Sequence, residues 1–383
     1  MPCTKQSRTI VIAMPVEIEQ LQGIKPGTRV VAAMSGGVDS SVAAALLQEA
    51  GCEVIGVMMQ LYPKDLPLAE PAEGGCCSLE AAHDARRVAD RLGIPFYLVN
   101  FEEVFTKEVI ERFAGEYLAG RTPNPCIVCN QKVKFAALAK KAEALGAAYV
   151  ATGHYVRRGR DEATGRYQLY RGVDQRKDQS YVLYGLNQKQ LAKALFPLGG
   201  LTKAQVREEA GKRGLVTAEK AESQEICFIP DNDYGRFLRD YRPESLHPGE
   251  IVDTKGRVLG RHPGVAFFTI GQRKGLGIAA GKPLYVVRLE PESNRVVVGE
   301  HEDCLAQECF VTDLNWLPWD KLPGALTVTV KVRYTAPAVP ATIEPWAGGV
   351  KVHFQTPQRA ITPGQAAVFY DGDKVLGGGT IQN

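Results

Sequence analysis

The chain has 383 residues, 45% of them hydrophobic and 23% charged, with a formal net charge of +3. This length predicts two or three domains with ample apolar cores, and the weak net charge permits nucleic-acid binding through local patches without demanding it. No stretch approaches the roughly 18 to 20 apolar residues of a membrane span, and nine cysteines, an odd number, do not indicate a disulfide framework. We therefore expect a cytoplasmic protein with no membrane partner.

The first informative stretch is a strand, a glycine turn and a helix in succession. We expect residues 1–25 to be an N-terminal extension, followed by a strand over the apolar run 30–34 and a helix from Val42 to Ala50. Between them lies Ser-Gly-Gly-Val-Asp-Ser-Ser, residues 35–41. Gly36 and Gly37 allow backbone N–H groups to converge on an anion at the helix N-terminus, which predicts a phosphate site.

The carboxylate of Asp39 is unusual in a phosphate-binding loop because it would repel the ligand. A divalent cation such as Mg²⁺ between the two would remove this conflict, so we expect the loop to be metal-assisted. The loop lacks the lysine of a Walker P-loop and the three-glycine spacing of a dinucleotide fingerprint. It resembles the pyrophosphate loop (PP-loop) of ATP pyrophosphatases, which activate a carbonyl oxygen as its adenylate.

The following segments extend an alternating α/β pattern. Strands are expected at 53–59, 94–99 and 147–151, and helices at 79–92, up to about residue 118, up to 146 and at 202–213. An irregular loop is expected at 121–130. This order predicts a doubly wound parallel sheet, in which nucleotides bind at the carboxyl ends of the strands. Met59 ends one strand there and is placed to pack against an adenine.

The second half of the chain has a different character. Glycines and prolines separate short alternating strands from residue 249 onward, most clearly over 326–334. We expect a PP-loop domain over 26–217, a central linking domain over 218–285 and an all-β barrel over 286–383.

Three cysteines lie in polar surroundings. Cys126 and Cys129 form a C-x-x-C pair in a proline-rich loop, and Cys227 follows about a hundred residues later. The spacing alone leaves a zinc site, a redox dithiol and simple packing residues open, although a zinc site would want a second pair. A redox pair is typical at the start of a helix near a βαβ unit, as here.

Several motifs in one order resemble the tRNA-specific 2-thiouridylases, which replace the 2-oxygen of the anticodon wobble uridine with sulfur. They run from about residue 28 to the C-terminus, so the resemblance is specific although each motif is short. The matching segments are residues 35–41, 120–125, 129–130, 134–135, 151–155, 177–181, 226–228 and 269–277.

The resemblance implies a role for each matching residue. ATP would be held by Ala33, Met34, Ser35, Gly36, Gly37, Val38, Asp39, Ser40, Met59 and Gly153. The target base would contact Asn124, Pro125 and Cys126. The tRNA would contact His154, Lys177, Asp178, Gln179, Arg333, Tyr334 and Gln365, in keeping with the preference of RNA-binding sites for phosphate contacts and base stacking. From charge alone, Lys177 would be a solvated surface residue.

The implied reaction is adenylation of the uridine 2-oxygen with release of pyrophosphate, followed by delivery of sulfur. Cys227 would carry a persulfide from a sulfur-donor protein, and Cys129 would be the nucleophile. Cys227 would have to move toward Cys129, with the surrounding segment becoming ordered on tRNA binding.

One position departs from the family pattern. The best-known members carry an aspartate where this chain has Cys126, and a thiol with a reference pKa near 8.5 is a poor substitute for a carboxylate. Three thiolates, Cys126, Cys129 and Cys227, could instead hold a [4Fe-4S] cluster with one open iron, as in some related tRNA thiolases. The persulfide and cluster routes both remain open at this point.

Two other functions are compatible with parts of the sequence. A PP-loop ligase or amidotransferase acting on a small molecule would need neither the thiols nor the β tail. A non-catalytic RNA-binding module with a structural metal would leave the PP-loop without a role.

Overall fold

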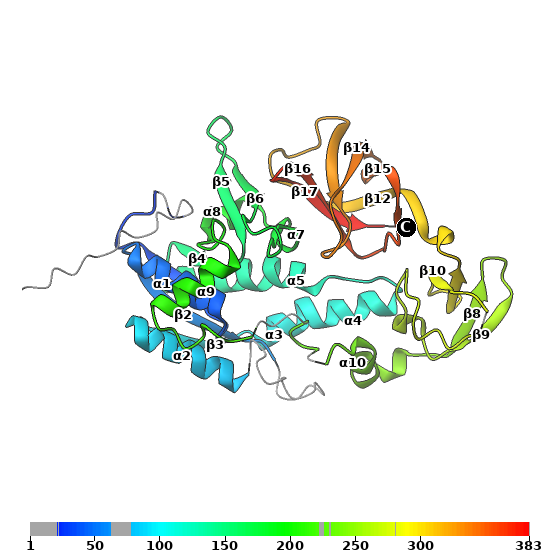
Figure 1. Ribbon diagram of the computed structural model, residues 1–383, viewed down its shortest axis with the longest axis horizontal. Helices are drawn as coiled ribbons and strands as arrows, with labels where there is room; N and C mark the ends of the chain where they lie inside the picture. Colours follow the sequence, from blue (N-terminus) through cyan, green and yellow to red (C-terminus); the bar gives the residue numbers. More distant parts are fainter. Residues whose placement is uncertain are drawn as a thin grey trace, which may run out of the picture.

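The structure is a computed structural model that describes residues 21, 23–62, 78–221, 226–229, 231–279 and 281–382. The predicted extension, apart from residues 21 and 23–25, lies outside this part of the chain. None of the helices in the described part is long and apolar enough to cross a membrane. Figure 1 shows three units along an elongated molecule: the parallel sheet, a β-barrel and a smaller sheet at the far end.

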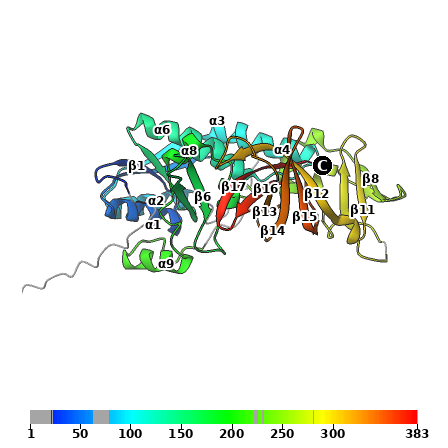
Figure 2. The same ribbon diagram turned by 90° about the horizontal axis from the view of Figure 1, so that it is seen from above.

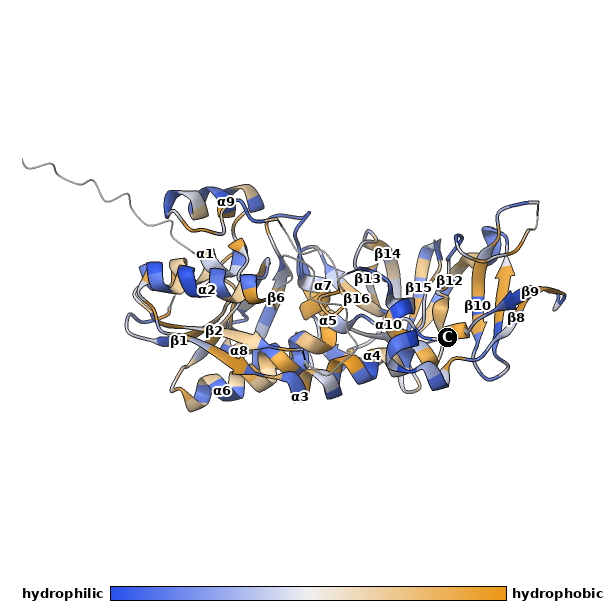
Figure 3. Cartoon of the chain, turned by 90° about the horizontal axis from the view of Figure 1, so that it is seen from below, coloured by the Kyte–Doolittle hydropathy of each residue, from blue (hydrophilic) through white to orange (hydrophobic). Residues whose placement is uncertain are grey.

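The first unit is a parallel sheet with strand order β3-β2-β1-β4-β7. Its strands are β1 (Arg29–Ala33), β2 (Glu53–Gln60), β3 (Phe96–Asn100), β4 (Tyr149–Ala151) and β7 (Ala194–Leu195). Figures 2 and 3 show α1 (Val38–Glu49), α2 (Leu79–Leu92) and α9 (Lys203–Lys212) on one face, and α6 (Leu138–Ala144) on the other. The predicted doubly wound architecture is therefore confirmed.

The alternation of side chains along β1 explains why both faces are covered. Val30 and Ala32 are buried with α1 and α2, whereas Val31 is buried in the opposite core beside Phe105 and Leu138. A strand that buries both faces requires a continuous apolar run, which is the signal in the sequence at 30–34.

Two long helical segments contain π-helical turns. One is formed by α3 (Glu102–Phe105), η2 (Thr106–Ile110) and α4 (Glu111–Leu118), and the other by α5 (Pro125–Val128), η3 (Cys129–Ala137) and α6. The first runs from the parallel sheet beneath the barrel toward the smaller sheet (Figure 1). The second begins at Pro125, five residues before the predicted loop ends, because Asn124 caps it and proline is favoured in a first helical turn. Stretches of π-helix are frequent at functional sites.

A hairpin that the sequence did not predict leaves the parallel sheet. Its strands are β5 (Val156–Arg160) and β6 (Tyr167–Arg171), and β6 pairs with the last strand of the chain at Tyr170–Lys374 and Leu169–Val375. Two short helices follow, α7 (Ser180–Leu183) and α8 (Gln188–Lys193).

The central unit contains α10 (Tyr234–Tyr241) and a four-stranded sheet of order β10-β11-β8-β9. The bounds are β8 (Gly249–Asp253), β9 (Val258–His262), β10 (Tyr285–Glu290) and β11 (Arg295–Gly299), with short 3₁₀ turns η4 (Pro243–Ser245), η5 (Val265–Phe267) and η6 (Glu302–Cys304). Because β11 pairs with β8, this sheet extends across the predicted domain boundary at 285/286.

The last unit is a closed barrel, as predicted. It is formed by β12 (Leu305–Trp316), β13 (Leu326–Lys331), β14 (Val339–Trp346), β15 (Gly349–Arg359), β16 (Ala366–Asp371) and β17 (Lys374–Ile381). The β12–β17 pairing closes the ring. Val328, Val330 and Val332 are buried inside it, which is the face that the alternating pattern selects.

Candidate active site

The glycine turn between β1 and α1 is fixed by a close contact with α2. Gly36 has φ +70°, and a Cβ atom there would lie 2.2 Å from the carbonyl oxygen of Ala81. Gly37 has φ −100° and precedes the first residue of α1, Val38. The helix therefore begins four residues earlier than predicted, and only Gly36 needs the conformational freedom expected of both glycines.

The hydroxyl groups of the loop organise its own backbone. Ser40 Oγ accepts from the backbone N of Ser35 at 3.1 Å and donates to the carbonyl of Gly37 at 3.1 Å. Ser41 Oγ donates to the same carbonyl at 2.8 Å. Ser40 and Ser41 are buried, whereas Ser35 is exposed, so Ser35 is the loop hydroxyl most accessible to a ligand.

Asp39 is neutralised by the protein itself. Its two carboxylate oxygens accept from Lys203 Nζ at 2.7 and 2.8 Å, and Tyr155 Oη donates to Oδ1 at 2.6 Å. The argument for a metal rested on an uncompensated carboxylate in the loop, and this ion pair removes that premise. Magnesium at the loop stays a prediction. The Asp39 carboxylate does not support it as a metal ligand, because its oxygens already accept from Lys203 and Tyr155.

The loop between β4 and β5 lies directly against the start of α1. A Cβ atom on Gly153 would come within 2.8 Å of the Asp39 carbonyl carbon and the Ser40 nitrogen. Met59 is partly buried near the carboxyl end of β2, one strand away. The residues expected to hold ATP, from Ala33 to Ser40 with these two, thus gather at the carboxyl edge of one sheet, and their contact with ATP stays a prediction.

The two cysteines of the C-x-x-C pair lie on the first turn of the α5–η3 helix. Asn124 Oδ1 accepts from the backbone N of Cys126 at 3.1 Å, and Pro125 occupies the first turn. Cys126 is exposed, whereas Cys129 is 8% exposed and belongs to the core. The expected nucleophile is therefore the sheltered member of the pair.

Cys227 is anchored by its neighbours in the chain. Tyr62 Oη donates to the Cys227 carbonyl at 2.5 Å, and Phe228 packs edge-on against Phe105 and Phe113. Desolvation raises the pKa of both Cys126 and Cys129, and a thiolate at Cys227 would raise each of them further. The three thiols of the prediction are therefore close enough to influence one another's titration, and the movement of Cys227 toward Cys129 stays a prediction.

Burial dominates the titration of this site. Desolvation raises the pKa of Cys126 to about 11 and that of Cys129 to about 12, and the ammonium of Lys134 partly opposes both shifts. Desolvation, aided by Lys134, also holds the pKa of His154 well below its usual value. At neutral pH the site therefore contains protonated thiols and an uncharged imidazole.

This titration predicts the alkylation behaviour of the ligand-free protein. Iodoacetamide reacts with the thiolate, so the rates at Cys126 and Cys129 should climb about tenfold per pH unit from about pH 7 to pH 10. A raised pKa keeps the proton on until high pH, so neither rate should level off in this range. Peptide mass spectrometry measures both rates, with N-acetylcysteine as a control that levels off earlier. A plateau below about pH 9 at Cys129 would contradict this prediction.

The thiols do not form a metal-ligand set as they are placed. In the described part of the chain, no three His, Cys, Asp or Glu side chains converge on a point that could hold a metal ion. The ligands of a [4Fe-4S] cluster lie farther apart than those of a single ion, so the cluster on Cys126, Cys129 and Cys227 stays a prediction.

Two of the expected tRNA contacts are buried. His154 is 8% exposed, lies between the rings of Phe135 and Phe196, and has its Nδ1 atom 2.7 Å from Thr152 Oγ1. Asp178 is 7% exposed and accepts from Ser180 Oγ and from the Ser180 backbone. Burial leaves little of either side chain for a direct contact with tRNA, and both are better explained as supports of their loops.

Three other expected tRNA contacts join parts of the chain. Gln365 Nε2 donates to the carbonyl of Thr122 at 2.7 Å. The N–H of Thr122 in turn donates to the carbonyl of Pro363 at 2.8 Å. Arg333 donates from Nη2 to the carbonyls of Ile270 and Ala360, which links the central unit to the barrel. The third residue is Gln179, whose side-chain oxygen accepts a hydrogen bond of 3.0 Å from the backbone N–H of Tyr155.

Tyr334 has the surroundings expected of a base-stacking residue. Its side chain is 40% exposed, and Lys331 Nζ lies 5.4 Å from its ring centroid. Desolvation raises the pKa of Tyr334, and negative charge on Asp178 or Cys126 would raise it further. Lys177 is partly buried in a turn in which its N–H donates to Asp174. The tRNA contacts of both residues stay predictions.

Three charged or polar residues at the site were not singled out for a role from the sequence. Tyr155 and Lys134 lie within the family-matching segments 151–155 and 134–135, so the sequence indicated their importance but not their contacts. Lys203 lies 164 positions from Asp39 and carries no sequence signal beyond the start of a helix.

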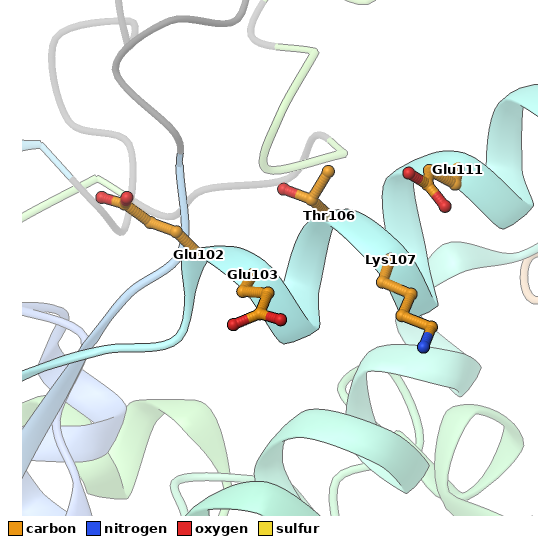
Figure 4. Close-up of a pocket in the computed structure, with 5 residues that line it drawn as sticks. All are labelled: Glu102, Glu103, Thr106, Lys107 and Glu111. Atoms are coloured by element: carbon orange, nitrogen blue, oxygen red, sulfur yellow. The ribbon is translucent and has the colours of Figure 1, made fainter.

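A cavity of about 480 Å³ lies along the α3–η2–α4 helix and is lined by none of these residues. It is lined by Glu102, Glu103, Thr106, Lys107 and Glu111, which Figure 4 shows on successive turns of that helix. Three carboxylates and one amine make it acidic, so it does not suit a nucleotide or tRNA phosphate.

A doubly wound sheet with a Ser-Gly-Gly-Val-Asp-Ser-Ser loop at the start of its first helix defines an ATP-using enzyme of the PP-loop class. Family models match residues 28–231 (tRNA methyl transferase HUP domain), 235–300 (tRNA methyl transferase PRC-barrel domain) and 306–381 (Aminomethyltransferase beta-barrel domain). The chain belongs to the tRNA-specific 2-thiouridylase family, as its curated relatives show.

Two of these relatives are each named tRNA-specific 2-thiouridylase MnmA. The protein of Moorella thermoacetica is 56% identical over 352 residues, which cover 92% of this chain and 98% of the relative. That of Carboxydothermus hydrogenoformans is 56% identical over 355 residues, with coverages of 92% and 97%. Among solved structures, the U34-tRNA thiolase NcsA from Methanococcus maripaludis with its [4Fe-4S] cluster aligns with a TM-score of 0.33 and 20% identity, covering 58% of this chain and 68% of that one. That likeness is too low to inform the site.

Proposed function

We propose that this protein is a tRNA sulfurtransferase that uses ATP to convert the wobble uridine of tRNA to 2-thiouridine. The observation that carries the proposal is a PP-loop at the start of α1 together with the Cys126 and Cys129 pair on the α5–η3 helix, in a chain of this family. The names of the curated relatives support it. They also disfavour a small-molecule ligase or a non-catalytic RNA-binding module.

The first step supplies a leaving group. The 2-carbonyl oxygen of uridine attacks the α-phosphorus of ATP, and pyrophosphate departs from the PP-loop. Backbone N–H groups at the start of α1 would face the phosphates, and their partial positive charge would favour the developing negative charge. Mg²⁺ bound to the phosphates would add further charge neutralisation.

The second step delivers sulfur. Cys227 carries a persulfide that it receives from a sulfur-donor protein. Cys129 is protonated in the ligand-free protein, so it gives up its proton to solvent as its sulfur attacks the inner sulfur. A Cys129–Cys227 disulfide forms, and hydrosulfide leaves and attacks C2 of the adenylated uridine, which expels AMP together with the former 2-oxygen. Alternatively, the terminal persulfide sulfur attacks C2 first and Cys129 then releases it by forming the same disulfide. Either route ends with a disulfide that a cellular thiol reductant must open with two electrons.

The cysteine loop and the barrel would act together on the tRNA. The target base would be flipped out toward Asn124, Pro125 and Cys126, which requires an unpaired anticodon nucleotide. Tyr334, exposed beside Cys126, supplies a ring for stacking. Cys126 takes the position of the family's aspartate as an uncharged thiol: the residue as a whole is exposed, but the protein atoms around its sulfur desolvate it and raise its pKa to about 11.

One experiment tests both the reaction and the sulfur route. The anaerobically purified protein is incubated with unmodified tRNA, ATP and a persulfide donor, and nucleoside mass spectrometry measures 2-thiouridine while AMP and pyrophosphate are quantified. We expect tRNA-dependent AMP formation and thiolation, with iron far below one equivalent per chain. Absence of tRNA-dependent AMP would overturn the function. Stoichiometric iron and acid-labile sulfide, lost together with activity in Cys126→Ala, would overturn the persulfide route.

A further inference from the structure

The family-matching segment 269–277 has no role in the reaction described above. Part of it lines, together with residues 282–284, a pocket of about 370 Å³ in the central unit. Leu276 lines this pocket and packs into the apolar core of the unit, and Arg273 and Lys282 are the charged residues that line it. No acidic side chain of the described chain lines it. The pocket is therefore basic, unlike the acidic cavity on the α3–η2–α4 helix.

Acidic residues are scarce around this pocket. Residues 254–289 contain seven lysine or arginine residues and no aspartate or glutamate. Lys282 pairs with Glu300 on an exposed surface, where an ion pair contributes little and can be exchanged for a contact with another anion. The nearby carboxylate of Asp303 accepts a hydrogen bond of 2.8 Å from the backbone N–H of Glu300. Of the two cations that line the pocket, Lys282 is therefore the paired one.

Arg273 and its neighbour Lys274 lack such a pairing. Both are exposed, and neither forms an ion pair with a carboxylate among the residues that the structure describes. A hollow that carries charge of one sign beside apolar walls strengthens the local field and attracts ions of the opposite charge. The pocket therefore carries positive charge that is available to an anionic ligand.

The backbone of the loop is both fixed and open. Gln272 Oε1 accepts from the backbone N of Thr269 at 3.0 Å, and its Nε2 donates to the carbonyl of Lys274 at 3.0 Å. The backbone N–H groups of residues 273–278 donate to no acceptor in the part of the chain that is described. Gly277 has φ +66°, and a Cβ atom there would meet nothing within 4 Å, so the turn rather than packing requires this glycine. Fixed loops with open N–H groups are suited to anions.

The loop is attached to the barrel beside the residue expected to stack on a base. Arg333 Nη2 donates to the carbonyl of Ile270 at 3.1 Å, and Arg359 Nη2 donates to that of Gly271 at 3.3 Å. Tyr334 follows Arg333 in the chain. The central unit and the parallel sheet lie at opposite ends of the molecule, with the barrel between them (Figures 1 and 2), so the pocket does not belong to the nucleotide site. A ligand that extends from Tyr334 to the pocket must be long and repeatedly anionic, as a nucleic-acid backbone is.

We propose that the pocket lined by Arg273 and Lys282 binds a backbone phosphate of the tRNA at a distance from the target base. The inference rests on the proposed function, from which it takes the tRNA substrate. Contacts to phosphate fix the register and orientation of a nucleic acid without reading its sequence. The pocket therefore positions the tRNA while the cysteine loop acts on the uridine.

The test compares Arg273→Gln and Arg273→Lys with Lys255→Gln. Lys255 is an exposed cation in the turn between β8 and β9 of the same unit and does not line the pocket, so it is a matched control for the loss of one charge. Arg273 is exposed and has no ion pair among the described residues, so its replacement should leave the fold intact. The dissociation constant of unmodified tRNA is measured on the full chain by fluorescence anisotropy at several salt concentrations. KM and kcat for tRNA-dependent AMP formation are measured in parallel.

We expect Arg273→Gln to weaken tRNA binding about 5- to 10-fold and to reduce the slope of log affinity against log salt by about one, as for the loss of one phosphate contact. The loss should fall on KM for tRNA rather than on kcat. Arg273→Lys keeps the charge and should restore most of the affinity. Lys255→Gln should stay within about twofold of wild type.

Three results would overturn the inference. One is an unchanged tRNA affinity and salt slope in Arg273→Gln, and another is an equal loss in Lys255→Gln, which would indicate only a general attraction. The third is full tRNA affinity with a loss of sulfur transfer from a donor protein, which would assign the pocket to that protein. All three can occur while wild type forms AMP in response to tRNA, so they leave the proposed function intact. If wild type forms no AMP with tRNA, the proposed function fails, but the tRNA affinity and salt slope of Arg273→Gln still test the phosphate contact.

Discussion

Replacement of Cys129 by serine should lower 2-thiouridine formation by about a thousandfold or more, the scale seen when a nucleophile is removed from a catalytic set. A serine hydroxyl can neither attack a persulfide at neutral pH nor form a disulfide with Cys227. ATP cleavage to AMP in the presence of tRNA should persist, because the adenylation groups lie on β1, α1 and β4 rather than on the cysteine helix. The two activities are measured on one sample by nucleoside mass spectrometry and by AMP release.

The control for this variant is Cys52→Ala. Cys52 is also buried, at 7% exposure, but it lies after α1 in the core on the other side of the sheet. Thiolation by Cys52→Ala should therefore stay close to wild type. Full thiolation by Cys129→Ser would refute the nucleophile assignment, whereas loss of AMP formation along with thiolation would show that Cys129 acts in binding or folding instead.

The Gly36→Ala substitution should have the largest effect on the fold of the nucleotide site. An alanine at φ +70° costs about 1–2 kcal/mol in backbone strain, and its Cβ would lie 2.2 Å from the Ala81 carbonyl oxygen. Because the clash is with backbone, the loop or α2 must move. We expect a loss of at least about 3 kcal/mol in the free energy of unfolding and about 100-fold in ATP affinity.

The neighbouring glycine provides a matched comparison. Gly37 has φ −100°, and a Cβ atom there would meet only the Ser35 hydroxyl at 3.6 Å. Gly37→Ala should therefore change the free energy of unfolding by no more than about 1 kcal/mol, the cost of alanine at a helix N-cap. Denaturant unfolding of both variants measures the difference. Equal effects would contradict the packing of α2 against Gly36.

The elements that the sequence predicted well are those whose signal is local. The apolar run of β1, the helix at 79–92 and the alternation over β13 each depend on neighbouring residues, and each was confirmed. The early start of α1 was missed because the polar residues Asp39 and Ser40 were assigned to the turn, although both are favourable in a first helical turn.

The parts that were missed depend on distant partners. The hairpin of β5 and β6 contains few apolar residues and owes part of its pairing to a strand about 200 positions later. The Asp39–Lys203 ion pair, 164 positions apart, has the same character. Such contacts leave no pattern in either segment, so a single sequence cannot reveal them. The roles of Cys129 and Cys227 came from a family resemblance, and the structure adds that they share one neighbourhood.

The pairing of β6 with the last strand has a consequence for how the protein is made. On the ribosome, β6 is complete about 200 residues before Lys374 and Val375 emerge, roughly 10 to 40 s at ordinary elongation rates. Throughout that interval the hairpin lacks its partner strand, and the Thr122 loop lacks Pro363 and Gln365, which support it in the finished fold. The nascent chain can therefore form the support of its cysteine loop only after Pro363 and Gln365 have emerged, and the β6–β17 pairing later still.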